Sequence, residues 1–296
     1  MRTITVPIIS SLLIALSCVI TMAGEYTNFI GIKFRDIPTG SFYMGCCEPT
    51  EGKFKYTKGD PRCPSGTDND FDNYASTNSA EYPQHKVTIS KPFQMGIHEV
   101  TYGQFWKYVG ATQPQRLENP PKKEDLNFPV IKVGWPGAQL FISWLNNNKP
   151  KNDTGTYRLP TEAEWEYSAR AGSTDKFSWG KVMKNGMANC NDASACGSKW
   201  SGRKAPVGSF PPNKFGLYDM SGNVWEWVED CWHDSYKGAP TDGSAWVNGE
   251  CEMRTIRGGS GNDDPYFLRN AMRSSAPADK SSGRNSFWGF RVVREP

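Results

Sequence analysis

The sequence has few histidines, no closely spaced cysteine pair of the zinc-binding type and no excess of charge of one sign. Its only histidines are His85, His98 and His233, which are scattered, and it has no Cys-x-x-Cys pair, so zinc has little support. Neither sign of charge dominates, because 34 basic and 31 acidic residues leave a net charge of +3. We therefore expect no nucleic-acid partner and no binding to an anionic membrane surface.

Charge is also scarce at the N-terminus, where Arg2 is the only charged residue before Glu25 and the residues between are largely apolar. One basic residue, an apolar core and a small-residue exit are typical of a secretory signal peptide. We expect residues 1–23 to be a signal peptide, leaving an exported domain of residues 24–296, periplasmic or secreted, without a stable membrane span. Two alternatives remain: a surface lipoprotein lipidated at Cys18, and a retained anchor, for which the apolar run is short.

The chain is rich in residues that interrupt regular structure. It contains 29 Gly and 21 Pro, with 11 Trp and a mean hydropathy of −0.62. Turn formers at this density leave few long helices or strands, so indole rings must supply much of the buried area. We find no internal repeat and no linker in residues 24–296, which predicts one large, irregular domain.

Cysteines in an exported protein mostly pair. Cys190 and Cys196 bracket a short polar loop, and Cys231 and Cys251 bracket one rich in Gly, Pro and Asp, so we predict these two disulfides. One of Cys46 and Cys47 can pair with Cys63, which leaves the other over.

Local patterns predict a few regular elements. Residues 30–34 and 87–89 read as strands, with a turn over residues 38–40. Capping boxes at Thr101 and Thr161 open two helices, over 102–109 and from 162 to Gly172. A third helix starts near Pro136 and stops at residues 146–148. We interpret the glutamates of the helix after Thr161 as capping and surface charge.

Residues 46–80 resemble an inserted loop. Asp68–Asp72 is similar to the start of a calcium loop but lacks the glycine and glutamate of the later positions. A solvated loop is the favoured interpretation.

Several motifs together resemble one family. In order, they are Ile37–Gly45, Glu99–Thr101, Arg158–Glu166, Phe215–Trp227, Arg257–Ser260, Arg269–Arg273 and Gly289–Arg291. This set is similar to the formylglycine-generating-enzyme, or sulfatase-modifying-factor, family over nearly all of residues 24–296. The resemblance implies an irregular α+β fold, low in regular secondary structure and related to C-type lectins.

The family's chemistry is not implied along with its fold. Its enzymes oxidise a substrate cysteine with two cysteines that bind copper(I) and lie between the Gly-Gly-Ser and Arg-x-Ala-x-Arg motifs. Here that stretch, residues 261–268, has no cysteine. We expect no copper and no formylglycine generation.

A calcium-binding turn of the family has a counterpart in residues 219–226. The resemblance implies a structural calcium ion held by the side chains of Asp219 and Glu226 and the carbonyls of Gly222 and Val224. The alternative is that Asp219 caps the turn and Glu226 pairs with an arginine. The family's other calcium loop falls near Asn189, where we expect the Cys190–Cys196 disulfide to replace the ion, so no second calcium site is predicted.

The arginines of the C-terminal motifs allow two interpretations. Arg257, Arg269, Arg273 and Arg291 either form an anion site or, as we favour, pair with acids and carbonyls inside the domain. Trp225 and Trp227 are expected in the core, with Trp288 more open.

Three functions are compatible with these features. The first is a non-catalytic protein that binds a protein or glycan ligand through polar C-terminal loops, which also resemble the variable region of lectin-fold proteins diversified by retroelements. The second is a periplasmic oxidoreductase or protein-maturation factor, and the third is an accessory component of a surface assembly. For the first we predict the ligand-binding residues Asn262, Asp263, Asp264, Tyr266, Phe267, Ser282, Asn285 and Trp288.

Overall fold

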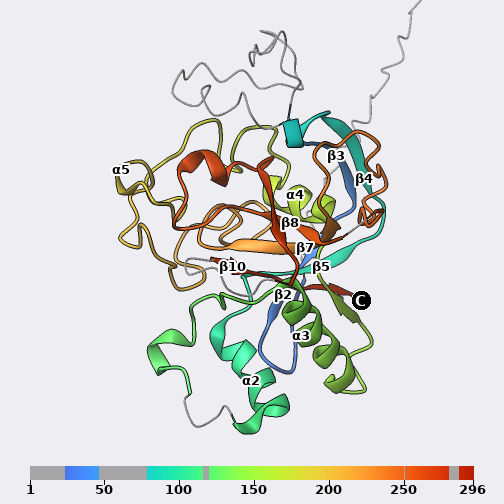
Figure 1. Cartoon of the computed structure of the whole chain (residues 1–296), viewed down its shortest axis with the longest axis vertical. Helices are drawn as coiled ribbons and strands as arrows, with labels where there is room; N and C mark the ends of the chain where they lie inside the picture. The colour runs from blue at the N-terminus through green and yellow to red at the C-terminus, as the bar shows by residue number, and fades with distance from the viewer. Residues whose placement is uncertain (1–23, 47–78, 116–119, 250, 280–286) are drawn as a thin grey trace, which may run out of the picture.

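The computed structural model describes residues 24–46, 79–115, 120–249, 251–279 and 287–296. The proposed signal peptide, Asp68–Asp72, Cys47 and Cys63 lie outside these residues. Within them, no helix has the length and apolar character needed to cross a membrane. The domain is mixed α+β with short elements joined by long irregular segments (Figure 1), as the glycine and proline content predicts.

Three sheets form the framework. The first, ordered β1-β2-β5-β11-β6, consists of antiparallel pairs. The second, ordered β10-β7-β8-β9, has one parallel pair, β10 with β7. The third consists of β3 and β4, which pair antiparallel. The strands are β1 (Glu25–Thr27), β2 (Lys33–Ile37), β3 (Gly40–Met44), β4 (His85–Ile89), β5 (Phe93–Gly96), β6 (Thr156–Arg158), β7 (Trp225–Cys231), β8 (Met253–Arg257), β9 (Arg273–Pro277), β10 (Trp288–Gly289) and β11 (Val293–Glu295).

The strand predicted over residues 30–34 is displaced. The Asn28 side chain accepts hydrogen bonds from the backbone N–H groups of Ile30 and Ile32, so these residues form a turn and β2 begins at Lys33. Such a local side-chain bond competes with strand pairing. The strand predicted over 87–89 is confirmed as part of β4.

Both predicted capping boxes are confirmed, at Thr101 for α2 and at Thr161 for α4. Helix α2 runs three residues past the predicted end, and α4 ends at Arg170, where Ala171 (φ 44°) adopts the left-handed conformation. Pro136 lies in the first turn of α3, as predicted. The helices are α2 (Tyr102–Thr112), α3 (Trp135–Asn148), α4 (Glu162–Arg170) and α5 (Ala193–Cys196), with 3₁₀ turns η1 (Ser79–Glu81), η3 (Lys123–Asp125) and η4 (Pro265–Leu268).

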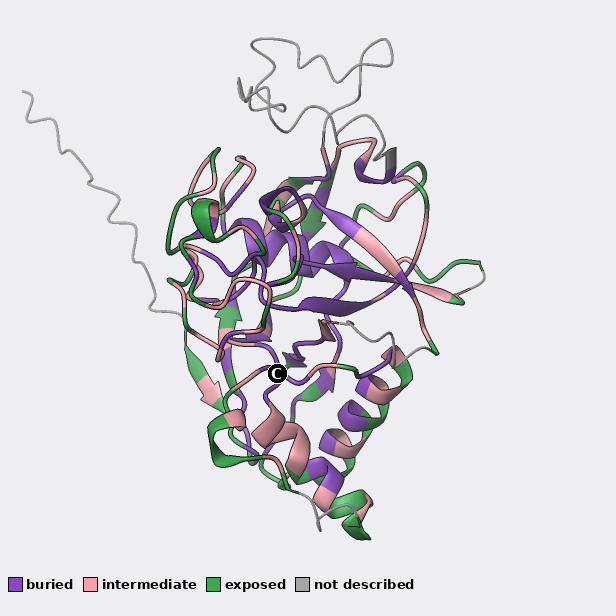
Figure 2. Cartoon of the chain, turned by 60° about the vertical axis from the view of Figure 1, so that its left-hand side comes forward, coloured by how far each residue is buried: buried purple, intermediate pink, exposed green. Residues whose placement is uncertain are grey.

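Helix α4 is the centre of one half of the molecule. It packs against β3, β7 and β8, whereas α2 and α3 lie together at the other end (Figure 1). Every residue of α4 is buried, and it appears purple with the central strands in Figure 2. The prediction that its glutamates carry surface charge is therefore wrong for Glu162 and Glu166, because the surrounding strands leave this helix no solvent face.

Candidate functional site

The four arginines of the C-terminal motifs belong to the core. Arg291 donates to both oxygens of Glu226, at 2.6 and 2.7 Å, and Arg273 donates to both oxygens of Glu162 at 2.8 Å. Arg257 pairs with Glu166 at 2.5 Å, and Arg269 with Glu81 at 2.7 and 2.9 Å. Other guanidinium donors go to backbone carbonyls, while Arg257 Nε has no partner among the described residues. The structural interpretation of these arginines is confirmed, and they offer no anion site.

The loop that follows Gly-Gly-Ser is held in place by main-chain hydrogen bonds. Gly261 N–H donates to Asn223 O, and Gly261 O accepts from Gly202 N–H. Asn191 N–H donates to Asp263 O. A Cβ atom at Gly261 would lie 2.2 Å from Arg203 O, so only glycine permits this approach. The loops 189–204 and 260–264 thus lie side by side, fixed by backbone rather than by exposed side chains.

The predicted ligand-binding residues divide into three groups. Asn262 and Asp264 are exposed, as a binding role requires. Asp263 instead accepts hydrogen bonds from Trp225 Nε1 and Ser260 Oγ, so its carboxylate shapes the loop. Ser282 and Asn285 lie outside the described residues.

The aromatic residues of this region serve packing more than binding. Only 6% of the surface of Tyr266 is exposed, which leaves little of its ring for a ligand, and its role as a ligand anchor stays a prediction. Phe267 and Trp288 are partly buried against the core, and the Trp288 ring meets the Trp227 ring edge-on at 5.6 Å. Trp225 and Trp227 are buried, as predicted.

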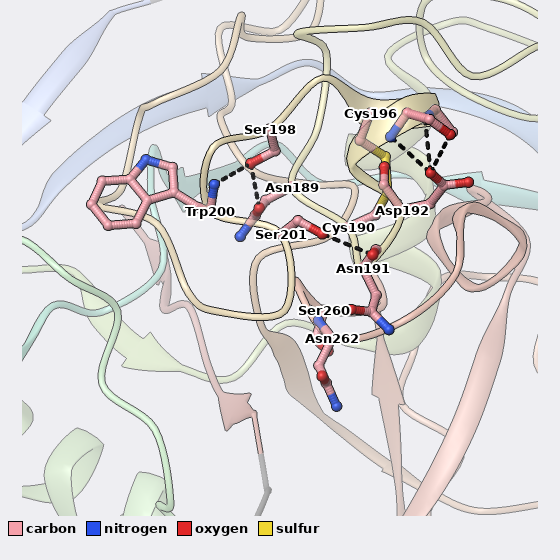
Figure 3. The surroundings of a disulfide bond; sticks show 12 residues. Asn189, Cys190, Asn191, Asp192, Cys196, Ser198, Trp200, Ser201, Ser260 and Asn262 are labelled. Carbon is pink, nitrogen blue, oxygen red and sulfur yellow. Dashed lines mark hydrogen bonds between the residues drawn. A yellow bond between two sulfur atoms is a disulfide. The ribbon is translucent and has the colours of Figure 1, made fainter.

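Both predicted disulfides are present. The Cα atoms of Cys190 and Cys196 are 6.1 Å apart, and those of Cys231 and Cys251 are 4.9 Å apart. Figure 3 shows the first disulfide next to Asn191, Ser260 and Asn262, so it closes the loop that supports the candidate face. Asn189 beside it is satisfied within the protein, because Ser198 Oγ donates to its oxygen and its amide donates to Arg203 O.

A cationic and aromatic cluster that the sequence analysis missed borders this loop. The ammonium group of Lys204 lies 4.2 Å from the centroid of the Tyr102 ring and 5.6 Å from that of Phe128. The Phe128 ring meets Trp200 at 5.5 Å, and Lys199 and Arg203 lie over Trp200 at 5.4 and 5.6 Å. Among the described residues, no carboxylate lies within 4 Å of the charged groups of Lys199, Arg203 or Lys204.

The environment of Lys204 disfavours its charge. Partial burial lowers the pKa of its ammonium group, with Asp125 acting in the opposite direction and Lys132 in the same direction. Aromatic faces compensate only part of the lost hydration of a cation. Asp125 supplies part of the counter-charge from beyond salt-bridge distance. We call Lys199, Arg203, Lys204, Asn262 and Asp264 the loop face.

The turn predicted to hold calcium is described in full. Gly222 has φ 86°, and a Cβ atom there would lie 2.1 Å from Asn189 O, so the turn requires glycine. Glu226 is occupied by Arg291 and by Trp165 Nε1, which is the alternative given above for this residue. Nothing in the structure tests the ion itself, and calcium stays a prediction.

Asp219 differs from Glu226 in lacking a cationic partner of its own. One of its oxygens accepts a hydrogen bond from Gly208 N–H, and the other has no partner, like one oxygen of the neighbouring Glu99. Burial raises the pKa of Asp219 to about 6, and burial with the charges of Asp219 and Glu226 raises the pKa of Glu99. The described residues contain no group of three or more His, Cys, Asp or Glu side chains arranged to hold a metal. If an ion binds here, Asp219 and backbone carbonyls must hold it without Glu226.

The protein is an irregular α+β domain. Buried arginine–carboxylate pairs hold its core, and disulfides close two of its loops. A family model described as the sulfatase-modifying factor enzyme 1-like domain matches residues 36–296, and the chain belongs to this family.

Individual proteins of known name are also similar to this chain. The chain is 33% identical over 186 residues to the formylglycine-generating enzyme of Mycobacterium tuberculosis, across 57% of this chain and 58% of that enzyme. Among solved structures, PvdO from Pseudomonas aeruginosa matches with a TM-score of 0.72 and 32% identity, across 93% of this chain and 98% of PvdO. Treponema denticola variable protein 1 matches with a TM-score of 0.63 at 22% identity, across 92% of this chain and 99% of that one, which shows the fold alone.

Proposed function

We propose that this protein is an exported, non-catalytic binding protein that uses the loop face to recognise an anionic group on a protein or glycan. The observation that carries the proposal is that the loop face combines a fixed backbone with exposed or unpaired polar side chains. Its backbone is fixed by hydrogen bonds to neighbouring loops, while Asn262 and Asp264 are exposed and three cations lack carboxylate partners among the described residues. Polar side chains on a rigid irregular loop suit recognition.

The same region argues against the family's cysteine oxidation. Copper(I) requires soft thiolate ligands, and residues 261–268 offer asparagine, aspartate and aromatic side chains instead. Cys190 and Cys196, which lie beside this loop, are joined to each other and buried. We expect the purified protein to leave a sulfatase-type cysteine peptide unchanged with copper(I) and oxygen. A mass change of the peptide above a no-enzyme control would show that the protein is an enzyme after all.

Binding is tested with a glycan array that contains sulfated, uronic-acid and neutral glycans, together with acidic and neutral peptides. We expect retention of acidic probes, weakening with salt because exposed charges are screened. The double variant Arg203→Gln, Asn262→Ala should lose that retention with an unchanged melting temperature. Lys91→Gln, an exposed lysine on the β4–β5 connection, is the matched control and should bind like the parent protein. Equal retention by parent and double variant would exclude the loop face.

A further inference from the structure

A cavity of about 270 Å³ lies away from the loop face, between β3, the C-terminal end of α4 and residues 172–174. It shares no residue with the loop face, and β3 and α5 lie on opposite sides of the molecule in Figure 1. Ligand sites in proteins span roughly 300–1,000 Å³. A cavity just below that range is suited to one small ring rather than to a long chain.

One wall of this cavity is aromatic. The Tyr167 ring lies between Phe42, at 5.4 Å, and Phe215, at 5.6 Å between centroids. Tyr43, with 47% of its surface exposed, stands among the lining residues. The Tyr167 plane is inclined to those of Phe42 and Phe215 by 54° and 53°, so the three rings form an angled apolar wall against which one face of another ring can pack.

Among the described residues that line the cavity, Arg170 is the only charged one, and it donates to Glu166 at 2.8 Å and to the carbonyls of Gly45 and Asp175. Its charge is balanced by Glu166, so the cavity offers no unpaired cation to an anion. An arginine in the wall also disfavours a cationic ligand.

Hydroxyl and amide groups supply the remaining polarity, from Ser41, Gln84, Ser173 and Thr174. The Tyr167 hydroxyl has no hydrogen-bond partner among the residues that the structure describes. Burial raises the pKa of that hydroxyl, so it remains a neutral donor at physiological pH. Because Tyr167 lines the cavity, a ligand bound there would provide an acceptor for this hydroxyl.

We infer that this cavity binds one neutral sugar ring, stacked on the Phe42–Tyr167–Phe215 wall and hydrogen-bonded to the Tyr167 hydroxyl. A sugar ring joins an apolar C–H face to a periphery of uncharged hydroxyls, which is the combination that this lining complements. Acidic sugars are disfavoured, because Arg170 is already paired with Glu166 and its charge is balanced there. This site is independent of the loop face, which we assign to anionic groups.

The test is saturation-transfer-difference NMR of the full protein with glucose, galactose, mannose and N-acetylglucosamine, with glucuronate as the charged comparison. We expect saturation transfer to ring protons of at least one neutral sugar and none to glucuronate. Tyr167→Phe keeps the ring and removes the hydroxyl, which should weaken binding about two- to tenfold, the value of one hydrogen bond. Thr174→Trp, at an exposed lining position, should fill the cavity and abolish the signal.

Two controls make the outcome decisive. Phe29→Leu alters an exposed aromatic residue elsewhere and should bind like the parent protein. The variant Arg203→Gln, Asn262→Ala should also keep sugar binding, which separates this site from the proposed function. The inference is overturned if no neutral sugar gives a signal, if glucuronate binds equally, or if Thr174→Trp and Tyr167→Phe, folded by thermal melt, bind like the parent protein.

Discussion

Cationic side chains have opposite roles in two regions of this molecule. In the interior, Arg257, Arg273 and Arg291 are almost completely buried, and each is matched to a glutamate. On the loop face, Lys199, Arg203 and Lys204 lie against aromatic rings, with no carboxylate within 4 Å among the described residues. The difference teaches that charge committed to the fold is already neutralised, whereas charge that lacks a partner remains available to a ligand.

The largest effect should come from breaking an interior pair. Arg257→Met leaves Glu166 buried with Arg170 as its remaining cationic partner, and removing one partner of a buried ion pair costs about 3–5 kcal/mol. Burial by itself would raise the pKa of Glu166, but Arg170 and Arg257 hold it below its usual value. A lowered pKa contributes stability at neutral pH that is lost as the pH falls. The free energy of unfolding of the variant should therefore decrease less on acidification than that of the parent protein. Urea unfolding of parent and variant at several pH values measures both; a change below 1 kcal/mol would contradict the pairing.

A smaller effect is expected at Asp219, which lacks the cation that its neighbour Glu226 has. Its pKa, raised from 3.8 to about 6 by burial, means that the folded state holds a proton which the unfolded state releases. Stability from this group is complete below pH 3.8 and is lost as the pH rises through 6. Bound calcium would reverse that loss, by about 2–4 kcal/mol at saturating ion.

Asp219→Asn separates the two explanations. The amide can still accept the hydrogen bond from Gly208 and can donate to Glu99, so the variant should lose the pH dependence in chelator. Thermal melts with calcium and with chelator complete the experiment. If neither protein responds to calcium, Asp219 acts only as a buried turn residue, and the calcium prediction is wrong.

The smallest effect on stability should come from the loop face. Lys204→Met keeps the length of the side chain against Tyr102 and Phe128 and removes a half-buried charge. Substitutions outside the packed core usually change stability by less than about 0.5 kcal/mol, and because this one also removes a partly buried charge, it should fall in that range or stabilise slightly. Retention of acidic probes should nevertheless drop. A loss of several kcal/mol would place Lys204 with the structural cations and remove the contrast between the two regions.

Sequence patterns anticipated the features that depend on neighbouring residues. Capping boxes at Thr101 and Thr161 need only two residues three apart, and the loop of Cys190–Cys196 is short. Features that depend on contacts between segments distant in the sequence were not predicted, or were predicted incorrectly. Lys204 meets Tyr102 and Phe128 only because three separate segments converge, and Glu166 looks like a surface residue until Arg257 is placed beside it. The burial of Tyr266 was not predicted, because a short 3₁₀ turn leaves no periodicity that indicates which side chains lie in the interior.

The position of β11 has a consequence for how the chain folds. This strand lies between β5 and β6, so Val293 pairs with Met95 on one side and Arg158 on the other. The five-stranded sheet therefore cannot join β6 to β1, β2 and β5 until residues 293–295 have been synthesised and have paired with both β5 and β6. Pairings across some 200 residues of sequence are slow to form, because the loop must close before any contact compensates for the lost entropy. We expect the incomplete chain to expose the edges of β5 and β6 until this last strand joins the sheet, and that interval is when chaperones would be most needed.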